Sequence, residues 1–133
     1  IGLYHNKAKH ILATCQILIN QYSSQIPSTR AKLEQLPGVG RKTANVVLNT
    51  AFKHPTIAVD THVSRVSQRV GLTYQTSPNK IEQELYQIIP KKYQMHAHHW
   101  LILHGRYICK ANKPLCSKCP IFNYCKFTNK IIL

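Results

Sequence analysis

The stretch Leu36-Pro37-Gly38-Val39-Gly40-Arg41-Lys42-Thr43-Ala44 interrupts an otherwise helical pattern with one proline and two glycines. Arg41 and Lys42 follow the glycines at once, at the start of the next expected helix. The positive end of a helix dipole favours anions in the first turn, so these cations break a local rule, and such breaks concentrate at functional sites. A short hairpin with outward-pointing amides beside cations can cradle a phosphate. The alternative is a basic, solvated helix start without a ligand.

Before the hairpin, the spacing of apolar residues predicts two helices. The first covers roughly residues 7–22, because apolar side chains recur along it at helical intervals. Its stripe includes Cys15, which we expect to lie buried in the core, since free cysteine is among the most buried residue types. A short second helix ends near Gln35, with Leu33 and Leu36 facing inward.

After the hairpin, the same spacing predicts four more helices and no strand. They cover about residues 41–53, 61–70, 78–89 and 95–108. Asp60 is the expected N-cap of the second of these helices, and Gly71 is its expected end. The valine stripe of that helix places Arg65 and Arg69 elsewhere on its surface. The sequence therefore predicts an all-α fold.

The composition is strongly basic. The chain has 133 residues, of which 18 are Lys or Arg and 4 are Asp or Glu, and its net charge is +14. Such a field indicates a nucleic acid or another anionic partner. We expect no membrane contact, because no run of about 18 apolar residues occurs. The chain opens on Ile1 and its single methionine is Met95, so we expect a fragment whose beginning is missing.

Four of the five cysteines crowd the end of the chain in the pattern C-x6-C-x2-C-x5-C: Cys109, Cys116, Cys119 and Cys125. So short a loop brings four sulfurs together only around a ligand. Thiolates select zinc or an iron-sulfur cluster, and four of them complete either site. Two disulfides are the alternative, but they need an oxidising compartment, for which the sequence carries no signal. The spacing alone does not decide between zinc and a [4Fe-4S] cluster.

Cations and histidines surround these cysteines. A basic collar that could reach phosphates consists of Arg106, Lys110, Lys113, Lys118 and Lys126. The alternative interpretation of these cations is that they belong to a solvated polar loop that binds no ligand. Four cysteines already complete the coordination shell of a metal site. We therefore interpret most of the nearby histidines as packing or surface residues; they are His96, His98, His99 and His104.

Two motifs in this order resemble the endonuclease III family of DNA glycosylase/lyases. The first is the helix-hairpin-helix of residues 36–44, with Asp60 eighteen residues after Lys42. The second is the cysteine pattern, which in that family holds a [4Fe-4S] cluster. Residues 44–52 and 98–107 are also similar to the family. The resemblance implies a helix-hairpin-helix DNA glycosylase fold. Residues 1–54 would form the second half of the helical barrel lobe, and residues 55–133 a helical lobe that ends in the cluster loop.

The resemblance also implies residue roles. Lys42 would be the nucleophile and Asp60 its carboxylate partner. An amine can displace a damaged base at the sugar C1′ and remain as a Schiff base, which permits β-elimination. Asp60 would stabilise positive charge on the sugar and assist proton transfer, besides capping its helix. The expected DNA-contacting residues are Gly38, Val39, Gly40, Arg41 and Lys113.

The resemblance implies a base-excision repair enzyme that removes oxidised pyrimidines and nicks the abasic site. We expect it to act as a monomer on double-stranded DNA that carries damaged bases or abasic sites. Its location would be cytoplasmic and nucleoid-associated in a bacterium, and nuclear or mitochondrial in a eukaryote. Two alternatives are a non-catalytic DNA-binding fragment or relic and the adenine-mismatch glycosylase branch. Members of that branch generally lack the lysine at the position of Lys42.

Overall fold

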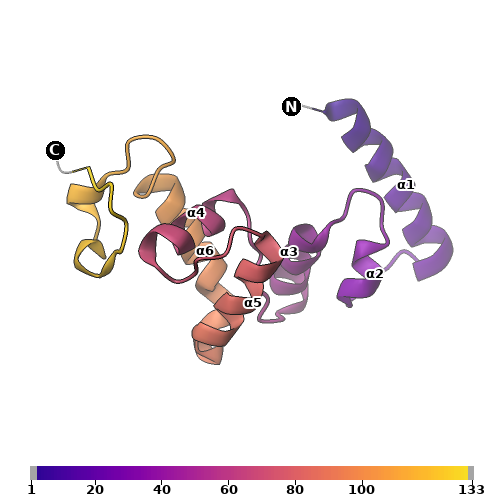
Figure 1. Cartoon of the computed structure of the whole chain (residues 1–133). Coiled ribbons are helices and arrows are strands. Elements are labelled where there is room, and N and C mark those ends of the chain that lie inside the picture. The colour runs from indigo at the N-terminus through magenta and orange to yellow at the C-terminus, as the bar shows by residue number, and fades with distance from the viewer. Residues whose placement is uncertain (1–2, 132–133) are drawn as a thin grey trace. The chain divides into compact units, whose positions relative to one another are not determined.

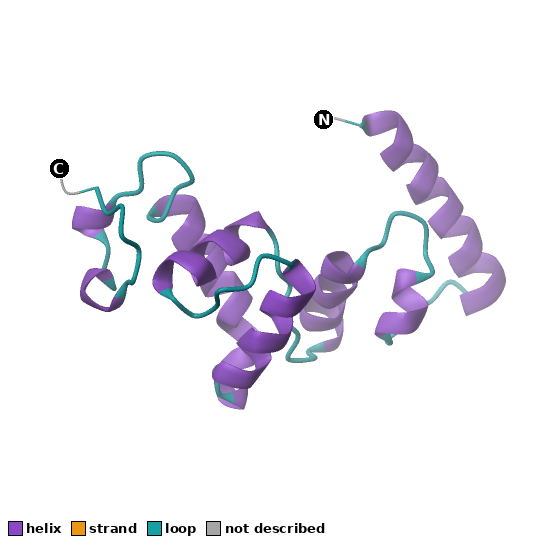
Figure 2. Cartoon of the chain, viewed as in Figure 1, coloured by secondary structure: helices purple, strands orange, loops and turns teal. Residues whose placement is uncertain are grey.

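The computed structural model describes residues 3–131, which form helices joined by loops and contain no strand (Figure 2). The helices, labelled in Figure 1, are α1 (Tyr4–Tyr22), α2 (Arg30–Glu34), α3 (Arg41–Phe52), α4 (Thr61–Val70), α5 (Pro78–Ile88) and α6 (Lys91–Tyr107). Two short 3-10 turns follow, η1 (Cys116–Lys118) and η2 (Phe122–Tyr124). The all-α prediction is confirmed, although α1 and α6 begin earlier than the sequence pattern indicates. The chain divides into two compact units between His54 and Pro55.

The core of the first unit joins α2, the hairpin and α3. Leu33 and Leu36 are almost fully buried, as predicted, and they pack with Ala44 and Leu48. The hairpin therefore lies between two segments that share one apolar cluster. This packing fixes where the hairpin starts and where α3 begins.

Helix α1 differs from its prediction, because it contains no buried residue. Cys15 is exposed, so the expectation of a buried core position is wrong. Side chains near the end of α1, among them Leu18 and Tyr22, pack partly against the core of the first unit. Ile11, one turn before Cys15, is 62% exposed. Periodicity shows which face of a helix is apolar, but burial also needs a second surface that covers that face.

The core of the second unit is formed by Ile57, Val59, Val63, Ile81 and Leu85. The valine stripe of α4 thus faces inward, as predicted. Helices α4 and α6 approach closely, since a Cβ atom on Gly105 would lie 3.0 Å from the Val66 side chain. Gly71 ends α4 with a φ of 90°, in the left-handed region that glycine favours.

No helix in the described part of the chain is long and apolar enough to cross a membrane.

Candidate functional site

The two glycines of the hairpin differ in what requires them. Gly38 has a φ of +77°, and a Cβ atom there would lie 2.8 Å from Nδ1 of His10. Gly40 has an extended backbone, with φ −94° and ψ 178°, and a Cβ atom there would meet no atom within 4 Å. The left-handed backbone conformation and the close approach of His10 therefore require glycine at position 38. Gly40 leaves open space at the start of α3, where another molecule can approach the backbone closely.

Helix α1 contacts the hairpin through two side chains. Thr14 Oγ1 donates a hydrogen bond of 3.2 Å to the carbonyl of Pro37. His10, one helical turn before Thr14, packs against Gly38. Neither residue belongs to a motif that predicts this role, and their i, i+4 spacing on α1 was the available signal.

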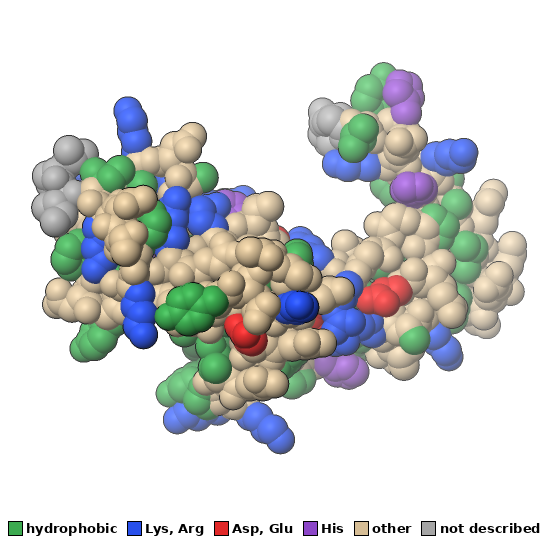
Figure 3. Space-filling view, in the orientation of Figure 1, with side chains coloured by type: hydrophobic (Ala, Val, Ile, Leu, Met, Phe, Trp, Pro, Cys, Tyr) green, Lys and Arg blue, Asp and Glu red, His purple; other side chains and the backbone are tan. Residues whose placement is uncertain are grey.

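The cations at the start of α3 face solvent to different degrees. Lys42 is exposed, and Arg41 is half-buried. Both lie in the first turn after Gly40, which is the N-cap of α3. Figure 3 shows Lys and Arg side chains over both units on the face drawn, where acidic side chains are few. A cationic surface of this kind is suited to a polyanion.

Asp60 caps α4, as predicted. Its Oδ1 atom accepts a hydrogen bond of 2.8 Å from the backbone N–H of Val63. The side chain is half-buried and directly follows the buried Val59. Because a carboxylate has two oxygens, a cap at one of them leaves acceptor capacity for another role. Lys42 belongs to the first unit and Asp60 to the second.

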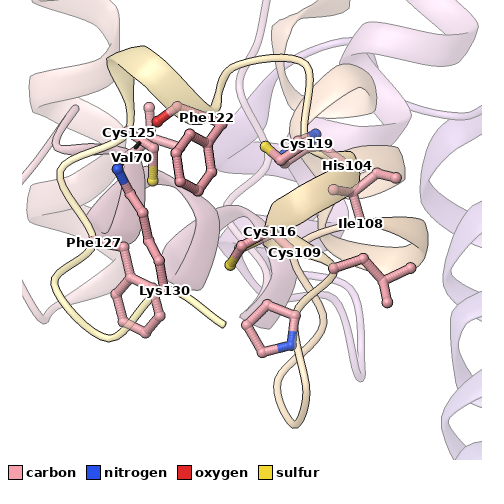
Figure 4. A pocket seen from close by; sticks show the side chains of 12 residues that line it. Val70, His104, Ile108, Cys109, Cys116, Cys119, Phe122, Cys125, Phe127 and Lys130 are labelled. Carbon is pink, nitrogen blue, oxygen red and sulfur yellow. Dashed lines mark hydrogen bonds between the residues drawn. The ribbon is translucent and has the colours of Figure 1, made fainter. Parts of the chain in front are cut away.

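The structure places the four C-terminal cysteines around one pocket (Figure 4). All four are half-buried free thiols. Cys119 lies beside His104, while Cys125 lies on the side of Phe127 and Lys130. His104 Nε2 is 3.6 Å from Cys119 Sγ, so this histidine belongs to the pocket wall rather than to the surface.

Burial and mutual repulsion act on the titratable groups of this pocket. Burial raises the pKa of the Cys119 thiol, a backbone hydrogen bond at Ile121 opposes the shift, and the neighbouring Cys125, Cys109 and Cys116 raise the pKa further. Burial also lowers the pKa of His104. Four thiolates so close together therefore require a positively charged centre to balance them.

The spacing of these sulfurs bears on what they could hold. Within residues 3–131, no three His, Cys, Asp or Glu side chains are close enough together to bind one metal ion. A tetrahedral zinc with Zn–S bonds of about 2.3 Å needs sulfurs roughly 4 Å apart. A cluster accepts wider spacing, because each thiolate binds a different iron. Four thiols are a donor set that either zinc or an iron-sulfur cluster can use.

Arg65 of α4 holds the start of the cysteine loop, a role that the sequence analysis missed. Its Nε donates to the carbonyl of Cys109 at 3.0 Å, and its Nη2 donates to the carbonyl of Gly105 at 2.7 Å. The same Nη2 lies 3.2 Å from Nδ1 of His62. Arg65 thus connects the first turns of α4 to the end of α6.

Arg69, one turn further along α4, holds the next part of the loop. It donates to the carbonyls of Lys110 at 2.7 Å and Ala111 at 3.0 Å. Its Nη1 also lies 3.6 Å from Sγ of Cys109, and its guanidinium lies 4.5 Å from the centre of the Phe127 ring. The i, i+4 spacing of Arg65 and Arg69, away from the valine stripe, was the available signal for both.

Comparison with known proteins identifies the family. Residues 1–91, which include the hairpin and Asp60, match the HhH-GPD superfamily of base excision DNA repair proteins. This chain belongs to that superfamily. The predicted resemblance to endonuclease III is also confirmed. An HhH-GPD relative from Rickettsia felis named Endonuclease III is 59% identical over 133 residues, which are 100% of this chain and 62% of the relative. The Endonuclease III of Escherichia coli K12 is 51% identical over 131 residues, which are 98% of this chain and 62% of that protein.

Solved structures agree with the HhH-GPD assignment. A trapped covalent intermediate of endonuclease III with DNA matches with a TM-score of 0.89 at 50% identity, over 95% of this chain and 60% of that one. A non-covalent endonuclease III–DNA complex matches with a TM-score of 0.88. The helix-hairpin-helix glycosylase fold is thereby confirmed. The chain spans about 62% of the length of the curated relatives that it matches.

Proposed function

We propose that this chain is part of a base-excision repair DNA glycosylase with AP lyase activity, which removes oxidised pyrimidines. One observation carries the proposal. Lys42 lies exposed directly after a hairpin that is open to solvent at Gly40, and the chain is 50% identical to an endonuclease III that was trapped covalently on DNA. A covalent intermediate requires a nucleophile, and an exposed amine beside a phosphate-binding hairpin meets that need.

Lys42 is the proposed nucleophile. Its amine forms a bond to the sugar C1′ while the bond from C1′ to the base breaks, and the base leaves with the bonding electrons and takes up a proton. The bond from C1′ to the ring oxygen then breaks, the ring oxygen takes up a proton that the amine nitrogen gives up, and a Schiff base remains between Lys42 and C1′. Loss of a proton from C2′ expels the 3′ phosphate by β-elimination, and water finally releases the amine. The target base must first be flipped out of the stack, since C1′ is otherwise shielded.

Asp60 is the proposed carboxylate partner of Lys42. Its negative charge stabilises the positive charge that develops on the sugar, and it assists proton transfer. The cap on Val63 occupies Oδ1, and it holds the carboxylate at the start of α4. The fixed position supports the assignment because electrostatic catalysis needs a charge that does not reorganise during the reaction.

Double-stranded DNA with damaged bases or abasic sites is the proposed substrate. Backbone amides of Gly38, Val39 and Gly40 would contact phosphates, together with Arg41 and Lys113. Lys113 is exposed and follows the part of the cysteine loop that Arg69 holds. The net charge of +14 supports a polyanionic partner. We propose that the enzyme acts as a monomer, in the cytoplasm and on the nucleoid if its source is bacterial, as its relatives are.

The proposed cofactor is a [4Fe-4S] cluster held by Cys109, Cys116, Cys119 and Cys125. The four thiols that line one pocket support a thiolate-bound group, and the similarity to endonuclease III favours the cluster over the alternative of zinc. Such a group stabilises the fold of its loop, because all its ligand positions belong to the protein. We also propose that residues 1–54 belong to a helical barrel lobe and that residues 55–133 form the cluster lobe.

Borohydride trapping on lesion-bearing duplex DNA tests the proposal. We expect a covalent adduct with the native chain and with Lys32→Ala, a control at an exposed lysine of α2. Lys42→Ala should give none. An adduct that persists in Lys42→Ala would assign the chemistry to another amine. DNA binding without any adduct in the native chain would favour the alternative of a non-catalytic DNA-binding fragment.

Substitution of Asp60 separates its two roles. Asp60→Asn keeps an N-cap side chain but removes the charge, so we expect ordinary stability, intact DNA binding and severely slowed base removal. Asp60→Ala should lose about 1 kcal/mol of stability as well. Unchanged turnover in Asp60→Asn would show that Asp60 acts only as the N-cap of α4.

A further inference from the structure

Arg69 reaches the backbone and a sulfur of the cysteine loop with the same guanidinium group. It donates to the carbonyls of Lys110 and Ala111, and its Nη1 also points to Sγ of Cys109 at 3.6 Å. Phe127 covers one face of the guanidinium at 4.5 Å. Hydrogen bonds to the carbonyls and the aromatic contact together restrict where the positive charge can lie. The charge is therefore held beside one particular cysteine.

Arg69 has two contacts with cysteine sulfur, and loss of the thiol protons changes their strength in opposite directions. Cys125 Sγ lies 3.4 Å from the carbonyl oxygen of Arg69, and this contact needs the thiol proton. Iron binding removes that proton, because the ligand is a thiolate. The N–H group that Arg69 directs at Cys109 instead gains strength, since a charge-assisted hydrogen bond is stronger than a neutral one. With a cluster bound, the contact from Cys125 to the Arg69 carbonyl would lose its proton, whereas the N–H group of Arg69 would keep an acceptor at Cys109.

Arg65 provides an internal comparison for Arg69. Both arginines lie on α4, both are half-buried, and both hold carbonyls of the segment between Gly105 and Ala111. Arg65 donates only to main-chain oxygens of that segment, at Cys109 and Gly105. Arg69 alone of the two directs an N–H group at a cysteine sulfur. A comparison of variants at the two positions therefore distinguishes the effect of holding the loop from the effect of a donor at a cysteine sulfur.

We propose that Arg69 is a positioning residue that raises the reduction potential of the cluster, while it also holds the loop that leads to Lys113. A positive hydrogen-bond donor at a ligand sulfur stabilises the more reduced and more negative state, and hydrogen bonds to sulfur are among the factors that set cluster potentials. The inference rests on the proposed function, because it requires the iron-sulfur cluster that was proposed there.

Protein electrochemistry on the anaerobically purified chain tests this role. Arg69→Gln should shift the reduction potential to a lower value, because it removes the positive charge at Cys109. The matched control Arg65→Gln should leave the potential close to that of the native protein. Hydrogen exchange of the Lys110 N–H group, which donates to the carbonyl of Ile108, should become faster in Arg69→Gln, since the loop loses the side chain that holds it through its carbonyls. Equal shifts of the potential in both variants would assign the effect to loop movement and overturn the proposal, as would an unshifted Arg69→Gln.

Arg69→Lys is a second variant in case the glutamine variant does not fold. It keeps a positive charge, but it cannot reach two carbonyls and a sulfur with one planar group. We expect its potential to fall below that of the native protein, and an unchanged potential would count against the proposal. Iron and acid-labile sulfide analysis of the native protein separates the two levels of inference. Stoichiometric zinc without iron would overturn the cofactor assignment itself, whereas an intact cluster with unshifted Arg69 variants would overturn only the role of Arg69.

Discussion

The hairpin at residues 36–40 and the cysteine loop at residues 109–125 are both short and irregular, but different interactions hold them. In the hairpin, Val39 donates to the carbonyl of Leu36 at 3.1 Å, and Gly38 adopts the left-handed conformation that the turn needs. The start of the cysteine loop is held by Arg65 and Arg69, which lie about 40 residues earlier in the chain. The hairpin is therefore shaped mainly by nearby backbone, and the loop mainly by distant side chains.

This difference indicates where each segment is vulnerable. A hairpin that is shaped by its backbone should fail when Gly38, the glycine in the left-handed conformation, acquires a side chain. A loop that is held by side chains and a bound group should fail when a ligand or an anchoring residue is removed.

The largest effect is expected from Cys109→Ser. Removal of one ligand should abolish binding of the cluster, and the loop should lose its fixed structure, because metal binding and folding are coupled. Visible absorption and iron content measure the loss. Cys15→Ser is the matched control, since Cys15 is exposed and lies outside the cysteine pocket. A Cys109→Ser protein that keeps its full iron content would show that the loop does not depend on this ligand.

The next largest effect concerns the glycines of the hairpin. Gly38→Ala should destabilise the first unit by about 2 kcal/mol or more, because the left-handed conformation costs roughly 1–2 kcal/mol with a side chain. The contact with His10, at 2.8 Å from the new Cβ, adds to this cost. Gly40→Ala should leave stability nearly unchanged. Thermal unfolding measures both, and equal losses would contradict the assignment of different roles to the two glycines.

DNA binding by the two segments can be compared through its salt dependence. If about five cations contact phosphates, the logarithm of the affinity should fall against the logarithm of salt with a slope near −4.5. Arg41→Gln in the hairpin segment and Lys113→Gln in the cysteine loop should each reduce the slope by about 0.9. Fluorescence anisotropy at several salt concentrations measures these slopes. A slope near zero in the native chain would contradict DNA binding through these cations.

The smallest effect lies away from both segments. Hydrogen bonds from Thr73, and secondarily from Gln75, hold the pKa of the Glu84 carboxyl below its usual value. A lowered carboxyl pKa stabilises the fold above the usual pKa, and this stabilisation disappears as the pH falls through the lowered value. Thr73→Val should therefore destabilise the chain at neutral pH, and the difference from the native chain should shrink in acid. A difference that stays constant with pH would contradict this link.

Features that depend on neighbouring residues could be predicted from the sequence. Gly38 in the hairpin, the Asp60 cap and the end of α4 at Gly71 all follow from backbone requirements within a few residues. The valine stripe of α4 follows from helical periodicity: Val59, Val63 and Val66 are buried as expected, whereas Val70 at the end of the helix is half-buried. In each case the interaction that decides the structure spans less than about two helical turns, so the sequence pattern contains it.

Features that depend on distant partners could not be predicted in this way. Cys15 lies in an apolar stripe, but the described part of the first unit does not cover that part of α1. The i, i+4 spacing of Arg65 and Arg69 places them on one face of α4, but it does not show that loop carbonyls about 40 residues away lie within their reach. The sequence around His104 predicts only a position on a helix. The fold of the cysteine loop brings Cys119 close to it.

Local sequence patterns are enough to predict the helices, the hairpin with Gly38, the cap at Asp60 and the grouping of four cysteines in one segment. Each of these follows from backbone geometry or from ligand chemistry over a short distance along the chain. Only the tertiary structure decided that the cysteines surround one pocket, that Arg69 contacts Cys109, and that the stripe of α1 around Cys15 is exposed. The physical reason is that burial and long-range hydrogen bonds depend on which surfaces meet, and periodicity does not carry that information.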